Sequence, residues 1–171
     1  MPKDDLAARV AALEEAVARL TAAAAPTTPP ARSDPGTFWA LEGLRDRLPA
    51  EAGTGAVLFT GTVDLPTGEH YDWQLARPVD DLLGTDWSAH AGTLAALGHP
   101  VRLLLLRQVL LGTRTAAELA EQEGLGTTGQ LYHHLRQLVG AGWLRSSSRG
   151  HYTVPAERVV PLLTILSGAI R

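Results

Sequence analysis

The chain of 171 residues contains no cysteine, which excludes disulfides and thiolate metal sites and fits a reducing compartment. It also lacks a long hydrophobic run. The longest, at residues 103–111, is interrupted by Arg107 and Gln108 and falls far short of the roughly 20 residues that a bilayer span requires. The N-terminus is acidic and amphipathic, without an apolar signal core. We therefore predict a cytoplasmic protein with no membrane partner.

Recognisable catalytic and metal-binding patterns are missing as well. No Ser–His–Asp set or pair of carboxylates stands in a known motif, so we expect no enzymatic activity. Four of the six histidines are scattered: His70, His90, His99 and His151. His133 and His134 are adjacent, but neighbouring side chains diverge by about 100° on a helix and chelate one ion poorly. We expect no metal and no other cofactor.

Residues 124–129 (GLGTTG) have the G-x-G-x-x-G spacing of a dinucleotide-binding loop. Such a loop follows a β-strand and is itself followed by an acidic residue about 20 positions later. Here the loop follows the helical pattern TAAELAEQE, and no acid occurs near residue 149. We interpret the glycines as a tight turn between two helices, where a positive φ is needed.

The N-terminal region has a heptad pattern. Apolar residues recur at spacings of four, three, four and three: Leu6, Val10, Leu13, Val17 and Leu20. Val at a and Leu at d favour a parallel two-stranded coiled coil, and an amphipathic helix packed on its own domain is the alternative. We predict a coiled-coil helix at 1–21 and a Pro/Ala-rich linker at 22–36.

Residues 37–85 change from a helical to an alternating pattern. Thr37 is the expected N-cap of a short helix that ends before Pro49 and carries one apolar face: Phe38, Leu41, Leu44 and Leu48. Residues 55–65 and 69–77 then alternate around a Pro-Thr-Gly turn and predict a β-hairpin. Because a lone hairpin is unstable, its apolar face must pack on a neighbour or a partner chain. Its aromatic residues either belong to a core or line a small-molecule pocket: Phe59, Tyr71 and Trp73.

Residues 86–155 predict a winged helix-turn-helix. Helices are expected at 89–97, at 101–111 after Pro100, at 116–123 and from Thr127 or Thr128 to Val139, followed by a strand–turn–strand at 143–154. Thr115 and Glu118 have the spacing of a capping box. The fold class is therefore mainly α with a small amount of β structure.

The fourth of these helices, at 127–139, carries the functional prediction. Leu131, Leu135 and Leu138 share its core-facing side. No Asp or Glu occurs from residue 124 to 156, although the segment contains three Arg and three His. The net charge of the chain is −3, so nucleic-acid binding requires a local basic patch of this kind. The predicted DNA-binding residues are Thr127, Thr128, Gln130, Tyr132, His133, Arg136, Gln137 and, at the tip of the wing, Arg149.

The stretch at about 90–154 resembles the winged-helix core of ArsR-type bacterial transcriptional regulators. The matching pieces are GHPVRLLLL, AELA, HHL and LVGAGWLRSSSRGHYTV. The resemblance implies a homodimer whose recognition helices enter successive major grooves of a pseudo-palindromic operator. Two features depart from it: the turn between the helices is one residue longer than usual, and the N-terminal helix and β-hairpin lie outside the family's core.

The C-terminal segment, 156–171, is apolar almost all round and must be buried, with its helix beginning near Pro161. We predict that it dimerises together with the helix at 89–97, through Leu162, Leu163 and Leu166. The whole sequence thus predicts a homodimeric, sequence-specific DNA-binding transcriptional regulator, with repression as the favoured output and a small-molecule or protein effector left open. The alternative is a winged-helix protein-interaction module that does not bind DNA.

Overall fold

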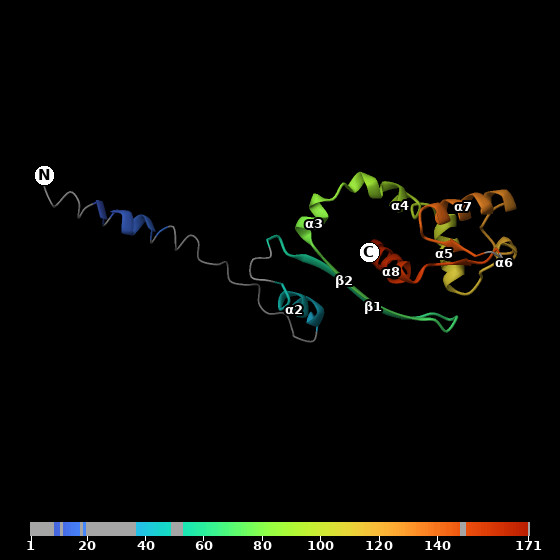
Figure 1. The fold of residues 1–171 in the computed structure, drawn as a ribbon, viewed down its shortest axis with the longest axis horizontal. Helices are drawn as coiled ribbons and strands as arrows, with labels where there is room; N and C mark the ends of the chain where they lie inside the picture. The colour runs from blue at the N-terminus through green and yellow to red at the C-terminus, as the bar shows by residue number, and fades with distance from the viewer. Residues whose placement is uncertain are drawn as a thin grey trace. The chain divides into compact units, whose positions relative to one another are not determined.

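The computed structural model describes residues 9–10, 12–17, 19, 37–48, 53–147 and 150–170. The chain divides into two compact units, Met1–Arg47 and Leu48–Arg171 (Figure 1). The described part is mainly α-helical with two small two-stranded antiparallel sheets, which confirms the expected fold class at this coarse level. In these described segments, no helix has the length and apolar character needed to cross a bilayer.

The first unit contains helical residues at 9–10, 12–17 and 19, and helix α2, Trp39–Arg45. The heptad positions Val10, Leu13 and Val17 are exposed in the single chain, whereas Leu6 and Leu20 lie outside the described residues. The coiled coil stays a prediction.

Two expectations about the short helix are corrected. Phe38, not Thr37, occupies the N-cap of α2, and no side chain caps this end. The helix also belongs to the first unit, whereas the β-hairpin belongs to the second. The sequence grouped them as one module at 37–85, because a pattern along the chain does not show which neighbours an element contacts.

The β-hairpin forms as predicted from β1, Ala56–Asp64, and β2, His70–Pro78, in a register that pairs Asp64 with His70 and Ala56 with Pro78. Gly68, with a φ of 84°, lies in the turn. One face of the hairpin is apolar and half-buried: Phe59, Val63, Tyr71, Trp73 and Leu75. Alternation of side chains across the pleat therefore gives the hairpin an inner and an outer face.

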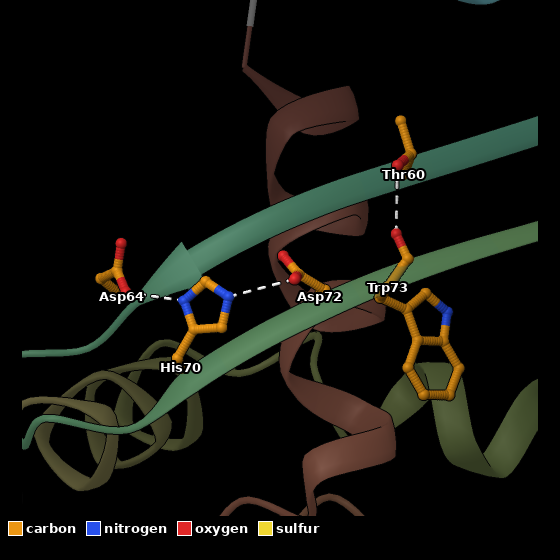
Figure 2. Close-up of polar contacts among 5 residues, drawn as sticks. All are labelled: Thr60, Asp64, His70, Asp72 and Trp73. Atoms are coloured by element: carbon orange, nitrogen blue, oxygen red, sulfur yellow. Dashed lines mark hydrogen bonds and ion pairs between the residues drawn. The ribbon is translucent and has the colours of Figure 1, made fainter.

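The outer face of the hairpin is polar. His70 lies between two carboxylates, with Nδ1 2.7 Å from Asp64 and Nε2 3.2 Å from Asp72 (Figure 2). Hydrogen bonds to Asp64 and then to Asp72 raise the pKa of His70. Because the protonated imidazole donates to both carboxylates, this contact is most favourable at mildly acidic pH.

Short helices follow the hairpin. Helix α3, Val79–Gly84, has no counterpart in the predicted pattern. The expected helix at 89–97 is instead a 3₁₀ turn, Trp87–His90, followed by α4, Ala91–Ala95. At the end of α4, the guanidinium of Arg102 donates to the Ala95 and Ala96 carbonyl oxygens at 2.9 and 2.6 Å, and so provides partners for carbonyl groups at a helix C-terminus.

The next three helices match the predicted pattern closely. Helix α5, Pro100–Leu110, starts with proline at its first position, and the His99 side chain accepts from the Val101 amide. Helix α6, Ala116–Ala120, has the predicted Thr115–Glu118 capping box but ends before residue 123. Helix α7, Thr128–Gly140, is followed by a second hairpin of strands β3, Arg145–Ser146, and β4, Tyr152–Thr153.

The core of the second unit lies between these helices. It consists mainly of leucines from α5, α6 and α7, with Trp143 as its largest fully buried side chain. The indole Nε1 of Trp143 donates to the Thr93 carbonyl oxygen at 2.8 Å, and the guanidinium of Arg158 lies 4.9 Å from the ring centroid. Trp143 thereby joins the segment after α7 to both α4 and α8.

Helix α8, Ala156–Ala169, begins more than one turn before the expected start at Pro161. Proline lacks the N–H that would donate to a carbonyl one turn earlier, and this costs about 3 kcal/mol in a helix interior. The full burial of Val159, Val160 and Leu162 around it contributes about 1.5–3 kcal/mol per side chain, which is sufficient to offset that cost.

Helix α8 is covered from two directions within the single chain. Val159 and Leu162 belong to the core cluster of the helices, whereas the inner face of the β1–β2 hairpin packs on another side of α8. A Cβ atom at Gly61 would lie 2.9 Å from Cγ1 of Val160. Leu162 is 1% exposed, so its assignment to a dimer interface is wrong: it is a core residue of its own chain.

Replacing Gly61 with Ala tests this close approach. The added methyl group meets the β-branched side chain of Val160, which has little rotamer freedom, and overpacking of this kind costs about 1–3 kcal/mol. Gly168→Ala is the control, because a Cβ there meets nothing within 4 Å. In urea unfolding, G61A should lower the free energy of unfolding and G168A should not; equal stability of the two variants would contradict this packing.

Candidate nucleic-acid interface

The turn before α7 is built from the glycines of the G-x-G-x-x-G stretch. Gly124 and Gly126 both have a φ of 82°, a conformation that disfavours other residues. Between them, Leu125 is 2% exposed and anchors the turn in the core. The interpretation as a turn between two helices is confirmed, and the glycines follow a helical segment rather than a strand.

A capping box starts helix α7. The backbone amide of Gln130 donates to Thr127 Oγ1, and the backbone amide of Thr127 donates to Gln130 Oε1 at 2.9 Å. The side-chain oxygens of two predicted DNA-binding residues are therefore engaged in local structure. We assign Thr127 and Gln130 to positioning the helix, and not to reading bases.

Three buried leucines fix the rotation of α7 about its axis. This leucine stripe consists of Leu131, Leu135 and Leu138, each at most 1% exposed. The opposite side of the helix, which we call the outer face of α7, consists of Tyr132, His133, Arg136 and Gln137, all exposed. The predicted orientation of these residues is confirmed. Thr128, at the first helical position, is exposed as well.

His134 lies at the border between the stripe and the outer face. Its ring centroid is 4.5 Å from that of His99, and its Nδ1 atom is buried without a hydrogen-bond partner among the described residues. Burial is the largest cause that lowers the pKa of His134, followed by the charges of His99, His133 and Arg102. At neutral pH His134 is therefore uncharged and supports the packing of α7.

The β3–β4 hairpin is held against the loop before α6. Thr115 and His151 form an additional antiparallel bridge, and the Tyr152 amide donates to the Arg114 carbonyl oxygen at 2.7 Å. These bonds place the hairpin on the same unit as α7. Arg149, the predicted contact at its tip, lies outside the described residues.

The sequence pattern did not indicate two charged residues that influence this surface. Glu157, directly after the acid-free segment, forms an ion pair of 2.5 Å with Arg145, so this arginine is not an unpaired cation. In the opposite direction, Arg102 from α5 lines a cleft of about 620 Å³ together with Arg136 and Gln137. It adds positive charge beside the outer face. Both contacts are tertiary and leave no periodic signal along the chain.

Two carboxylates of the second unit, those of Glu118 and Glu69, make local contacts. The Glu118 carboxylate accepts from the backbone amides of Thr115 and Arg114, and the first of these bonds is the main cause that lowers the pKa of Glu118. Glu69, in the β1–β2 turn, pairs with Arg114. Hydrogen bonds from Thr67 and Arg114 lower the pKa of Glu69. None of these carboxylates belongs to the outer face of α7.

The predicted aromatic ligand residues separate into two groups. Phe59 and Trp73 line a cleft beside α8, whereas Tyr71 packs against the helical core. Across the described ranges, no group of three or more His, Cys, Asp or Glu residues is arranged to hold a metal ion.

Comparison with known proteins adds no family assignment: the chain matches no protein-family model, no curated protein and no solved structure.

The lowered pKa of His134 has a testable consequence for stability. In the unfolded chain His134 has a pKa near 6.5, whereas in the folded chain its pKa is lower. Below pH 6.5 the unfolded chain therefore binds a proton more readily than the folded chain, so the free energy of unfolding falls as the pH drops through that value. His134→Asn should reduce this loss between pH 7 and 5, and His133→Asn, on the exposed neighbour, should reduce it less. NMR titration of the imidazoles checks the cause, and a His134 pKa at or above 6.5 would refute it.

Proposed function

We propose that residues 86–155 are a winged helix-turn-helix and that the protein is a homodimeric, sequence-specific DNA-binding transcriptional regulator. In this proposal α7 is the recognition helix, and the β3–β4 hairpin is the wing. The observation that carries it is the outer face of α7, where four exposed side chains are able to contact bases or phosphates. The buried leucine stripe fixes the rotation of this helix. The segment from residue 124 to 156, which contains the helix, has no Asp or Glu.

The side chains of the outer face suit the edges of base pairs. The guanidinium of Arg136 matches the two acceptors of guanine, and the amide of Gln137 matches the donor and acceptor of adenine. Tyr132 and His133 suit either bases or phosphates. The major groove is about 12 Å wide, which admits an α-helix of roughly 10–12 Å diameter.

The N-terminus of α7 supports the same docking. The first amides of a helix have no intrahelical partner and carry partial positive charge. At this end, the backbone amides of Thr127 and Gln130 are bonded within the capping box, to Gln130 Oε1 and Thr127 Oγ1. Gly129 has open space where a Cβ would lie, so a phosphate can approach the first turn closely. Arg102, beside Arg136, adds long-range attraction for the DNA backbone.

Arg136→Ala tests the assigned surface. The variant should bind a genomic DNA fragment more weakly, by about 1–3 kcal/mol if Arg136 reads a base. If the residue neutralises a phosphate, the slope of log K against log salt should decrease by about 0.9. Fluorescence anisotropy over a series of salt concentrations measures both.

Arg45→Ala is the control for that experiment, because it removes the same charge from an exposed position on α2 in the other unit. It should leave the affinity for DNA nearly unchanged. If R136A and R45A bind as tightly as the unaltered protein, the outer face of α7 is not the DNA-binding surface.

Dimerisation is proposed through a leucine groove between α5 and α8. The groove has a volume of about 600 Å³ and is almost entirely apolar, with Leu103, Leu104, Leu110, Leu163 and Leu166 among its lining residues. Leu104 and the neighbouring Ile165 are each 40% exposed in the single chain. A second copy packed on this groove would cover the apolar surface and give a symmetric dimer with two copies of the recognition helix.

Leu104→Glu should convert the dimer to monomers, because it places a charge in the proposed interface. Leu111→Glu is a matched control: Leu111 is 45% exposed and directly follows the same helix, but it is not among the residues that line the groove. Sedimentation velocity should show a monomer for L104E and a dimer for L111E. A dimeric L104E, or a monomeric unaltered protein at tens of micromolar, would contradict this interface.

A second candidate function is a protein-interaction module without DNA binding. It is favoured by the exposure of Leu83 and Trp87, which are 62% and 66% exposed in the segment between the hairpin and α4. Large apolar side chains at the surface are typical of protein-binding sites. This candidate predicts no retention of genomic fragments at low or at moderate salt.

A further inference from the structure

The inner face of the β1–β2 hairpin is not covered along its whole length by the helices of the second unit. Near the turn, Val63 and Tyr71 pack against the helical core. In the middle, Gly61 meets Val160 of α8. Towards the open end, Phe59, Trp73 and Leu75 instead line a cleft of about 800 Å³, bounded on its other sides by the end of α7, strand β3 and the first turns of α8. We call this space the aromatic cleft.

The apolar wall of the aromatic cleft suits a flat ring. Phe59 and Trp73 lie on the same face of adjacent strands, where Trp73 is paired with Gly61 and therefore has no opposite side chain. Trp73 projects from β2 in Figure 2. Aromatic side chains bind other rings by offset or edge-to-face stacking, and a volume of several hundred Å³ is typical of small-molecule sites.

The polar wall carries an excess of positive charge. Three arginines and one glutamate line the cleft: Arg77, Arg145, Arg158 and Glu157. Arg145 is paired with Glu157. Among the described residues, neither the guanidinium of Arg77 nor that of Arg158 makes an ion pair, and the Arg158 guanidinium lies over the Trp143 ring. Two guanidinium groups thus remain available for an anion.

We propose that the aromatic cleft binds a small aromatic carboxylate. The ring of the ligand lies against Phe59 and Trp73, and its carboxylate accepts hydrogen bonds from Arg77, whose planar fork matches both carboxylate oxygens. Arg158, on the opposite wall, adds positive charge. A neutral aromatic compound lacks the carboxylate that contacts Arg77, and an aliphatic acid lacks the ring that stacks on Phe59 and Trp73. Both should therefore bind more weakly.

The position of the cleft gives such a ligand a route to the DNA-binding surface. Arg145 and Ser146 of strand β3 and Val139 of α7 line the same space, so an occupied cleft restrains the wing relative to the recognition helix. This regulatory effect rests on the proposed function. Binding of the carboxylate does not, and it is therefore measured without DNA.

The experiment titrates the full chain with 2-naphthoate by isothermal calorimetry, and with 2-naphthamide as the neutral analogue of the same shape. The carboxylate should bind at least about tenfold more tightly than the amide, as expected for a charge-assisted hydrogen bond to arginine. Arg77→Gln should weaken naphthoate binding by about the same factor, whereas Arg45→Gln, on the other unit, should not change it. Equal affinity for the two compounds, or unchanged binding by R77Q, would overturn the proposal.

The location of the bound ring needs its own measurement, because Arg77 also borders a smaller pocket that includes Trp87. Each indole N–H signal in a proton–nitrogen NMR spectrum is assigned with a Trp→Phe variant. 2-Naphthoate should shift the signal of Trp73, whose Nε1 atom has no hydrogen-bond partner among the described residues. A shift of Trp87 without a shift of Trp73 would place the ligand in the smaller pocket and overturn the assignment. Binding of naphthoate by a protein that does not bind DNA would leave this site intact and refute the proposed function alone.

Discussion

The burial of helix α8 from two directions is the constraint on which the second unit depends. Val159 and Leu162 join the helical core, and Val160 meets the β1–β2 hairpin at Gly61, where no side chain intervenes. A hairpin of two strands is only marginally stable in water, so it depends on packing against α8. The apolar surface of α8 in turn depends on the hairpin for its burial. The mutual burial makes the hairpin an integral part of the unit rather than an accessory module.

The same packing also fixes the position of helix α7 in the second unit. Trp143, directly after α7, is fully buried, bonded to the Thr93 carbonyl and stacked against Arg158 of α8, so the end of the helix cannot turn independently of α8. The leucine stripe fixes its rotation. A binding surface on a rigid element holds its side chains in one geometry. The outer face of α7 has this property, and the aromatic cleft lies between the same elements.

Strong local signals made α7 and the β-hairpin predictable. A capping residue and a leucine repeat define the helix, and alternation around a turn defines the hairpin. Contacts between distant elements were not predictable. The pattern around Leu162 shows that the side chain is buried, but not that its own chain buries it. Pro161 suggested a helix start, because the compensating burial of its neighbours is a tertiary effect. Arg102 and Glu157 alter the charge of the candidate surface from other helices.

The most direct test of the central claim is selection of genomic DNA. Fragments of the native genome are mixed with the full-length protein at moderate salt, and the retained fragments are sequenced. The account predicts enrichment of a shared inverted repeat whose half-sites lie about one helical turn, 10–10.5 base pairs, or a multiple of it apart. Recovery of fragments with no sequence enriched over the input, at low as well as at moderate salt, would contradict it.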